Sequence, residues 1–249
     1  MKKHFPLMMN APEKGIGFAA FIYGVLCFFS VPFLILLFMH QLLNDPIILS
    51  WIEIGYHVFN FFILIPMYRQ YLSDSLFEAR IDWKRIAEIV AICAIVIVGL
   101  FVGLAQLFPL VASEELLLVL NNMVPVTEMD LFWTSGSVVA TVPLWGTLCM
   151  VLIVPFVTVL IYYASFFASI CCDRPWVAYL VVIVVTALPR IANATTFWAP
   201  EPQMILYFTR LPIHLLSCWT FQKTDNVWTP IALHMVVNLV SSLLFLLMF

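Results

Sequence analysis

Charged residues are scarce in this chain of 249 residues. Lysine and arginine together number 11, aspartate and glutamate number 14, and the four types make up 10% of the sequence, against 64% for hydrophobic residues. A typical soluble domain has about a quarter of its residues charged. This composition therefore excludes an ordinary soluble globular protein. No cluster of basic residues stands out and the formal net charge is −3, so nucleic acid is not an expected partner.

Regular alternation of polar and apolar residues is also missing, which argues against the strands of a membrane β-barrel. The six cysteines are scattered through apolar segments and lack the paired spacing of a metal site. We expect them to be small buried residues without a redox role. The sequence predicts no metal and no bound cofactor. It contains no linker or low-complexity tract, so residues 1–249 are expected to form a single membrane-embedded domain.

Long apolar runs fill most of the chain, and each is about as long as a membrane-spanning helix. They predict seven spans, at about 16–43, 47–69, 86–112, 140–171, 176–199, 203–220 and 228–249. The first run is longer than the core of a signal peptide and no small-residue cleavage site follows it, so we expect it to be retained. Segment 114–133 is compatible with an eighth element, either an interfacial helix or a re-entrant piece. The predicted fold class is all-α, a polytopic bundle of about seven transmembrane helices.

The distribution of basic residues predicts the orientation of this bundle, because cytoplasmic loops are enriched in lysine and arginine. With a cytoplasmic N-terminus and an outside C-terminus, nine of the eleven basic residues fall on the cytoplasmic side: Lys2, Lys3, Lys14, Arg69, Arg80, Lys84, Arg85, Arg174 and Lys223. The predicted outer segments contain none. We expect an integral protein of a bacterial plasma membrane, in contact with lipid. The largest cytoplasmic segment, 70–85, is interpreted as a solvated connection.

Polar residues within the spans recur at steps of three and four, which places each set on one helical face. The sets are Ser50, Glu53, His57 and Asn60; Thr158, Tyr162 and Ser165; Thr186, Arg190 and Asn193; Arg210, His214 and Ser217; and His234, Asn238 and Ser241. Five such stripes predict a bundle with an apolar outside and a polar interior. For hydroxyl and amide groups, hydrogen bonding between helices is the simplest explanation.

Charged side chains within the spans need a stronger explanation, because a central charge costs about 3 kcal/mol on insertion scales. Glu53, Arg190 and Arg210 are the three in question. Glu53 and Arg210 are predicted to lie in the same half of the membrane, so an ion pair between them is expected. An anionic ligand would then complete a site at the remaining arginine.

The stretch "KTDNVWTPIALHMVVNLVSSL" (223–243) resembles the last motif of the CPBP (Abi) family, which contains CAAX proteases and bacteriocin-processing or immunity proteins. The matching residues are Lys223, Trp228, Pro230, His234 and Asn238. The resemblance covers about residues 140–249 in pattern. It implies a helical bundle that cleaves peptides inside the membrane, in which a glutamate pair of a first motif activates water and His234 and Asn238 serve as catalytic residues.

The upstream segments depart from the family pattern. In "PFVTVLIYYA" (155–164), Thr158 and Val159 stand where the glutamate pair is expected, and Tyr163 stands where an arginine is expected. Asn193 replaces the histidine of the second motif. Neither threonine nor valine can act as a general base. The prediction is a family-like protein that lacks protease activity and binds a membrane protein, a peptide or a lipid-linked ligand, as an immunity or regulatory protein would.

Two alternatives remain open. The first is an active CAAX-type endopeptidase that uses other groups, for example Glu53 with His57. The second is a small transporter or anion-binding protein, suggested by the intramembrane arginines. A zinc site from His57, His214 and His234 is not expected, because these residues come from different helices without a motif. The predicted binding residues are Thr158, Arg190, Asn193, Arg210, His214, Glu53 and His57, beside the retained pair His234 and Asn238.

Overall fold

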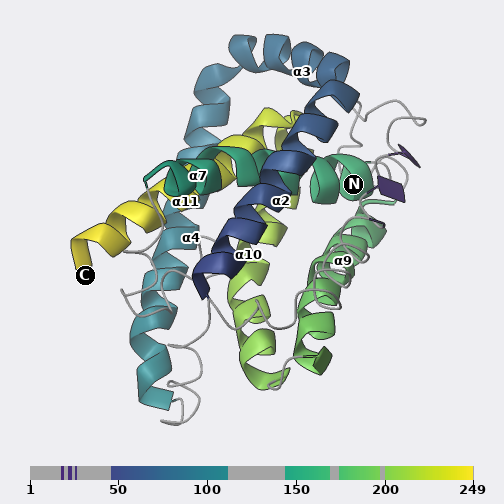
Figure 1. Ribbon diagram of the computed structural model, residues 1–249. Coiled ribbons are helices and arrows are strands. Elements are labelled where there is room, and N and C mark those ends of the chain that lie inside the picture. The colour runs from purple at the N-terminus through teal and green to yellow at the C-terminus, as the bar shows by residue number, and fades with distance from the viewer. Residues whose placement is uncertain are drawn as a thin grey trace.

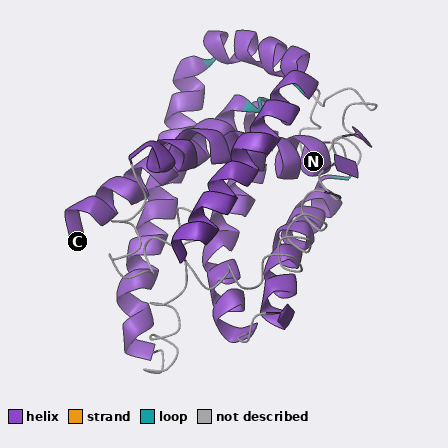
Figure 2. Cartoon of the chain, viewed as in Figure 1, coloured by secondary structure: helices purple, strands orange, loops and turns teal. Residues whose placement is uncertain are grey.

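The structure, a computed structural model, describes residues 18–19, 22–23, 26, 46–111, 144–168, 174–196 and 200–248. All regular structure in these ranges is helical, and none of them contains a β-strand (Figure 2). The predicted all-α class is therefore confirmed for the described part of the chain.

Six of the seven predicted spans coincide with helices. These helices are α2 (Pro46–Met67), α4 (Trp83–Val111), α7 (Leu144–Thr158) continued by the π-helix η3 (Val159–Ala168), α9 (Pro175–Thr196), α10 (Pro200–Thr224) and α11 (Trp228–Met248). The first predicted span lies largely outside the described residues, and the predicted element at 114–133 lies entirely outside them.

Figure 1 shows the axes of α4, α9 and α10 roughly aligned, with the chain in α10 running opposite to that in α9, and with α7 and η3 lying across these helices. The most extensive packing joins α9 to α10. Helix α9 also packs against η3, helix α2 packs against α7, and helix α11 packs against α4, α7 and α10. Because η3 also contacts α10, the segments η3, α10 and α11 meet in the middle of the bundle.

Segment 70–85 is mostly helical and mostly exposed, as expected for a connection, although part of it is buried. It contains α3 (Arg69–Ile81), which joins α2 to α4. Leu72 and Ser75 on one face of α3 are buried, whereas Phe77 and Ile81 are exposed. The helix forms because this inner face packs against the start of α11.

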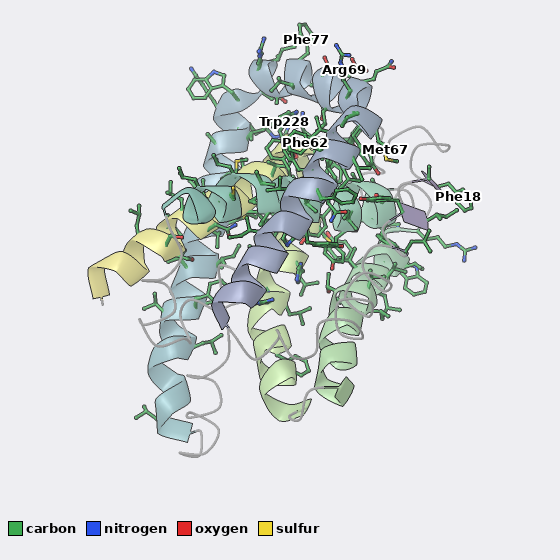
Figure 3. The ribbon with its side chains drawn as sticks, in the orientation of Figure 1. Phe18, Phe62, Met67, Arg69, Phe77 and Trp228 are labelled. Atoms are coloured by element: carbon green, nitrogen blue, oxygen red, sulfur yellow. The ribbon has the colours of Figure 1, made fainter. Side chains whose placement is uncertain are left out.

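Hydrogen bonds from the turn between α10 and α11 hold α3 in place. The side-chain amide of Asn226 donates to the carbonyl oxygen of Ser75 at 2.7 Å, and the indole N–H of Trp228 donates to the carbonyl oxygen of Leu72 at 3.0 Å. In Figure 3, Trp228 lies below the end of the molecule where Arg69 and Phe77 are labelled. These bonds connect positions about 150 residues apart in the sequence.

The turn itself is tight. Asp225 has a φ of 50°, the left-handed conformation that commonly ends a helix, and its N–H donates to the carbonyl oxygen of Phe221. The Oδ1 atom of Asn226 then accepts the backbone N–H of Trp228 at 3.0 Å. This bond satisfies one of the N–H groups that the first turn of α11 would leave without a partner.

Helix α4 has apolar side chains on both its buried face and its exposed face. Its buried face contains Val90, Cys93, Ala94, Ile97 and Phe101. This face packs against Ile213 of α10 and against Leu233 and Val237 of α11. Its exposed face contains Ile92, Ile95, Val96, Leu100 and Val102. A water-soluble helix would present polar residues there.

Two segments in the described residues are long and apolar enough to cross a membrane, Trp83–Leu104 and Val151–Ala168. The first segment is largely exposed, whereas most of the second segment is buried inside the molecule. Shorter apolar helical segments occur at Ile54–Met67, Pro175–Ala187 and Trp228–Leu243. The arrangement with seven crossings therefore stays a prediction.

Candidate functional site

The π-helix η3 forms the first wall of the candidate site. All ten of its residues are buried. Pro155 lies one turn before it inside α7 and has no N–H to donate. The hydroxyl of Ser165 donates to the carbonyl oxygen of Leu160 at 2.8 Å, five residues earlier. This is the spacing of backbone hydrogen bonds in a π-helix, a form that occurs frequently at functional sites.

Tyr68, between α2 and α3, supports this wall from outside. Its hydroxyl lies 2.7 Å from the Oγ atom of Ser165, and both residues are buried. Because Ser165 gives its single hydrogen to Leu160, Tyr68 is the donor in this bond. The end of α2 therefore helps to fix the register of η3.

Tyr163 occupies the centre of the site. Its hydroxyl oxygen lies 2.7 Å from Nδ1 of His214 on α10 and 3.3 Å from Nε2 of His234 on α11. Tyr163 is completely buried, His234 is 6% exposed, and His214 is half-buried. One hydroxyl group thus joins imidazoles from two other helices. We call these three residues the Tyr–His–His cluster.

A charged group lies beside this cluster. Arg210 is buried and precedes His214 by one turn of α10. It is close enough to His214 and to Tyr162 of η3 to interact electrostatically with both. The rings of Tyr162 and His214 are 6.2 Å apart and meet edge to face. The guanidinium group therefore brings a positive charge close to the His214 end of the cluster.

Further polar residues on the same two helices face the interior. Ser217 is completely buried on α10, one turn after His214. On α11, Asn238 is 1% exposed and Ser241 is completely buried. The polar stripes that the sequence shows in these two segments therefore point inward, as their helical spacing requires.

The structure does not place every predicted site residue. Thr158 is the last residue of α7 and is half-buried, and the neighbouring Val159 is completely buried. The side chains of Glu53, Arg190 and Asn193 lie outside the described residues. The ion pair between Glu53 and Arg210, and the anionic ligand at Arg190, therefore remain predictions.

The three histidines considered above as zinc ligands are His57, His214 and His234. His57 is buried in α2, but within the described part of the chain no three histidine, cysteine, aspartate or glutamate side chains are grouped to hold a metal ion. His214 and His234 do approach each other, and the group between them is the hydroxyl of Tyr163.

Tyr163 is the central residue that the sequence-based list of site residues omits. The sequence does provide a signal, because the CPBP resemblance aligns Tyr163 with the arginine of the first motif. In the structure it contacts His234 of the third motif. The segments that the resemblance aligns with these two motifs are therefore neighbours in space.

Comparisons of the chain with protein-family models, with curated proteins and with solved structures found no match. The CPBP resemblance consequently rests on the residues of 223–243 and on the spacing of the segments upstream.

Proposed function

We propose that the protein is an integral membrane protein of CPBP type that binds a membrane protein, a peptide or a lipid-linked ligand without cleaving it. The observation that carries this proposal is the contact between Tyr163 and His234. It places a phenol, and not a carboxylate, against the histidine of the retained motif.

The distribution of side chains supports a membrane location. Buried polar residues occur on most described helices, including Asn60, Thr186, Arg210 and Asn238. Large apolar side chains are exposed on the same helices, for example Phe62, Leu180 and Leu243. In water this arrangement would leave extended apolar surfaces uncovered, whereas in lipid it buries polar groups against one another.

The contact between two predicted cytoplasmic segments supports the proposed orientation. Nη2 of Arg85 donates to the carbonyl oxygen of Lys223 at 3.3 Å, and Asn226 bonds to Ser75. Segments on opposite sides of a bilayer would be separated by about 30 Å of hydrocarbon. Their direct contact is what a location on the same side of the membrane requires.

The absence of a suitable base supports the loss of proteolysis. The positions of the glutamate pair hold Thr158 and Val159, and Val159 is packed in the apolar core. Tyrosine keeps its proton near neutral pH, so Tyr163 cannot replace a carboxylate as the base that activates water. Among the described residues, Tyr163 is the one hydrogen-bonding partner of His234. Removing a positioned base typically lowers a rate by about 10²–10⁴-fold.

The polar and charged side chains of the site are suited to binding a ligand. The side chain of Asn238 can donate and accept hydrogen bonds, and Arg210 carries a positive charge. Polar and charged groups inside a membrane are costly and are therefore usually retained for a ligand, a pathway or a partner. The family resemblance makes a lipidated peptide the first ligand to examine.

The proposal can be tested with purified protein in lipid nanodiscs and a farnesylated peptide that ends in a CAAX sequence. We expect the peptide to bind and to remain intact by mass spectrometry. Asn238→Ala should weaken binding about 5- to 150-fold, because losing a buried polar partner costs about 1–3 kcal/mol. The neighbouring exposed residue provides the control, Leu239→Ala, which should bind normally.

Two results would contradict the proposal. Peptide cleavage that disappears in His234→Ala would identify the protein as an active endopeptidase. Equal affinity of wild type, Asn238→Ala and Leu239→Ala would place the ligand elsewhere on the molecule.

A further inference from the structure

The hydrogen bonds of the Tyr–His–His cluster join three groups that can each donate and accept a proton. We propose that His234, Tyr163 and His214 form a proton-transfer chain that connects the buried His234 with the half-buried His214. This inference concerns movement of a proton and does not require that a peptide binds.

The number of hydrogens determines how the chain is arranged. A tyrosine hydroxyl has one hydrogen to donate and can accept another, and a neutral imidazole has one N–H and one bare nitrogen. The shorter contact, 2.7 Å, is assigned to donation from Tyr163 to Nδ1 of His214. At the longer contact, 3.3 Å, Nε2–H of His234 donates to the hydroxyl oxygen. Both histidines then have their proton on Nε2.

One proton can cross this chain with every group conserved. A hydronium ion gives a proton to the bare Nδ1 of His234, and the Nε2 proton of His234 passes to the oxygen of Tyr163. The original hydroxyl proton passes to Nδ1 of His214, and His214 gives its Nε2 proton to a water molecule. Each imidazole again holds one proton and the tyrosine is neutral. Reversal of all the hydrogen bonds allows a proton to travel in the opposite direction.

The surroundings favour transfer along this route. Tyr163 is completely buried and His234 nearly so, whereas His214 is half-buried. Leu233 and Val237, which flank His234 on α11, are buried in the apolar core. The hydroxyl of Tyr163 is the described group that bridges His234 to the more accessible His214.

Neighbouring groups also limit where charge can stay. Arg210 and Cys218 approach the chain from α10, and Tyr162 approaches it from η3. The positive charge of Arg210 disfavours a second positive charge on His214. A proton that reaches His214 is therefore expected to move on and not to remain there. An imidazole is suited to this step, because its two ring nitrogens let it accept a proton on one side and release a proton on the other.

The first experiment reads the tautomers of the wild-type protein in nanodiscs by long-range ¹H–¹⁵N NMR with labelled histidine. We expect His214 and His234 to play opposite roles toward the hydroxyl, one presenting a bare nitrogen and the other an N–H. Two bare nitrogens, or two N–H groups, facing Tyr163 would break the chain and overturn the proposal. Because it uses the wild type, this measurement does not depend on the folding of a variant.

The second experiment measures exchange of the His234 ring proton with D₂O. Tyr163→Phe keeps the ring and removes the hydroxyl, so the exchange rate should fall at least about tenfold. This is a smaller decrease than the roughly 10²–10⁴-fold that is typical when a positioned proton-transfer group is removed. Tyr162→Phe is the matched control, since Tyr162 is adjacent and also buried but does not bridge the two histidines. Exchange that is unchanged in Tyr163→Phe, or slowed equally in both variants, would overturn the proposal.

Discussion

Replacing Asn226 by alanine removes two hydrogen bonds of different kinds. The residue is 3% exposed and lies between α10 and α11. Its Nδ2 atom donates to the carbonyl oxygen of Ser75, which holds α3 against the bundle. Its Oδ1 atom accepts the N–H of Trp228, the first residue of α11.

The two losses set the expected magnitude. Loss of a side-chain acceptor at a helix start typically costs about 1 kcal/mol. A buried carbonyl left without its donor costs about 1–3 kcal/mol. Asn226→Ala should therefore lower the free energy of unfolding by about 2–4 kcal/mol in total.

Denaturant titration of the purified protein in mixed micelles would measure this change. Lys223→Ala is the control, because Lys223 is exposed in the same region and contributes its backbone carbonyl to the contact with Arg85. A surface change of this kind should stay within about 0.5 kcal/mol. If Asn226→Ala also stays within about 0.5 kcal/mol of the wild type, the reasoning that this turn holds α3 is refuted.

Three further predictions address packing and orientation. Tyr68→Phe removes the donor to Ser165 and should lower the free energy of unfolding by about 0.5–1.5 kcal/mol; a double-mutant cycle with Ser165→Ala should show that the two effects are not additive, and additivity would contradict the bond. Ile97→Ala, at a fully buried position of α4, should cost about 2–5 kcal/mol in the same titration, whereas Ile95→Ala, at a 72% exposed position, should cost clearly less. Phe77→Cys, in a chain whose six native cysteines are replaced by alanine, should react with a membrane-impermeant thiol reagent in inside-out vesicles and not in right-side-out vesicles; the reverse pattern would exclude the proposed orientation.

The helices of this fold were predictable because apolar runs as long as a membrane span leave few alternatives to a helix. The predicted segment 176–199 compares with Pro175–Thr196 in α9, and 228–249 compares with Trp228–Met248 in α11. Agreement at these ends reflects local signals. Proline begins α9, and the Asn226 turn precedes α11.

Helix α3 was not predicted because its stability comes from distant parts of the chain. Its sequence is polar on average and its buried face is small. The groups that hold it, Asn226 and Trp228, lie about 150 residues away. The resemblance marks Trp228 as a motif residue, and in the structure its indole N–H binds a backbone carbonyl of α3.

The candidate site was predictable in part. Steps of four residues place Arg210 with His214, and His234 with Asn238, on common helical faces. Helical spacing does not tell which faces meet, however, and it assumes a regular α-helix. Tyr163 joins the site from a π-helix, whose wider turns change the direction of every side chain that follows.

The π-helix η3 also has a consequence for chains of different length. A π-helical turn is equivalent to an α-helix with one residue inserted. Because the wider turn absorbs the extra residue, a homologous chain one residue shorter between Val159 and Tyr163 could continue α7 as an ordinary α-helix and keep its tyrosine on nearly the same face. A one-residue deletion there should therefore be tolerated better than the same deletion in a regular α-helix, where it would rotate every following side chain by about 100° around the helix axis.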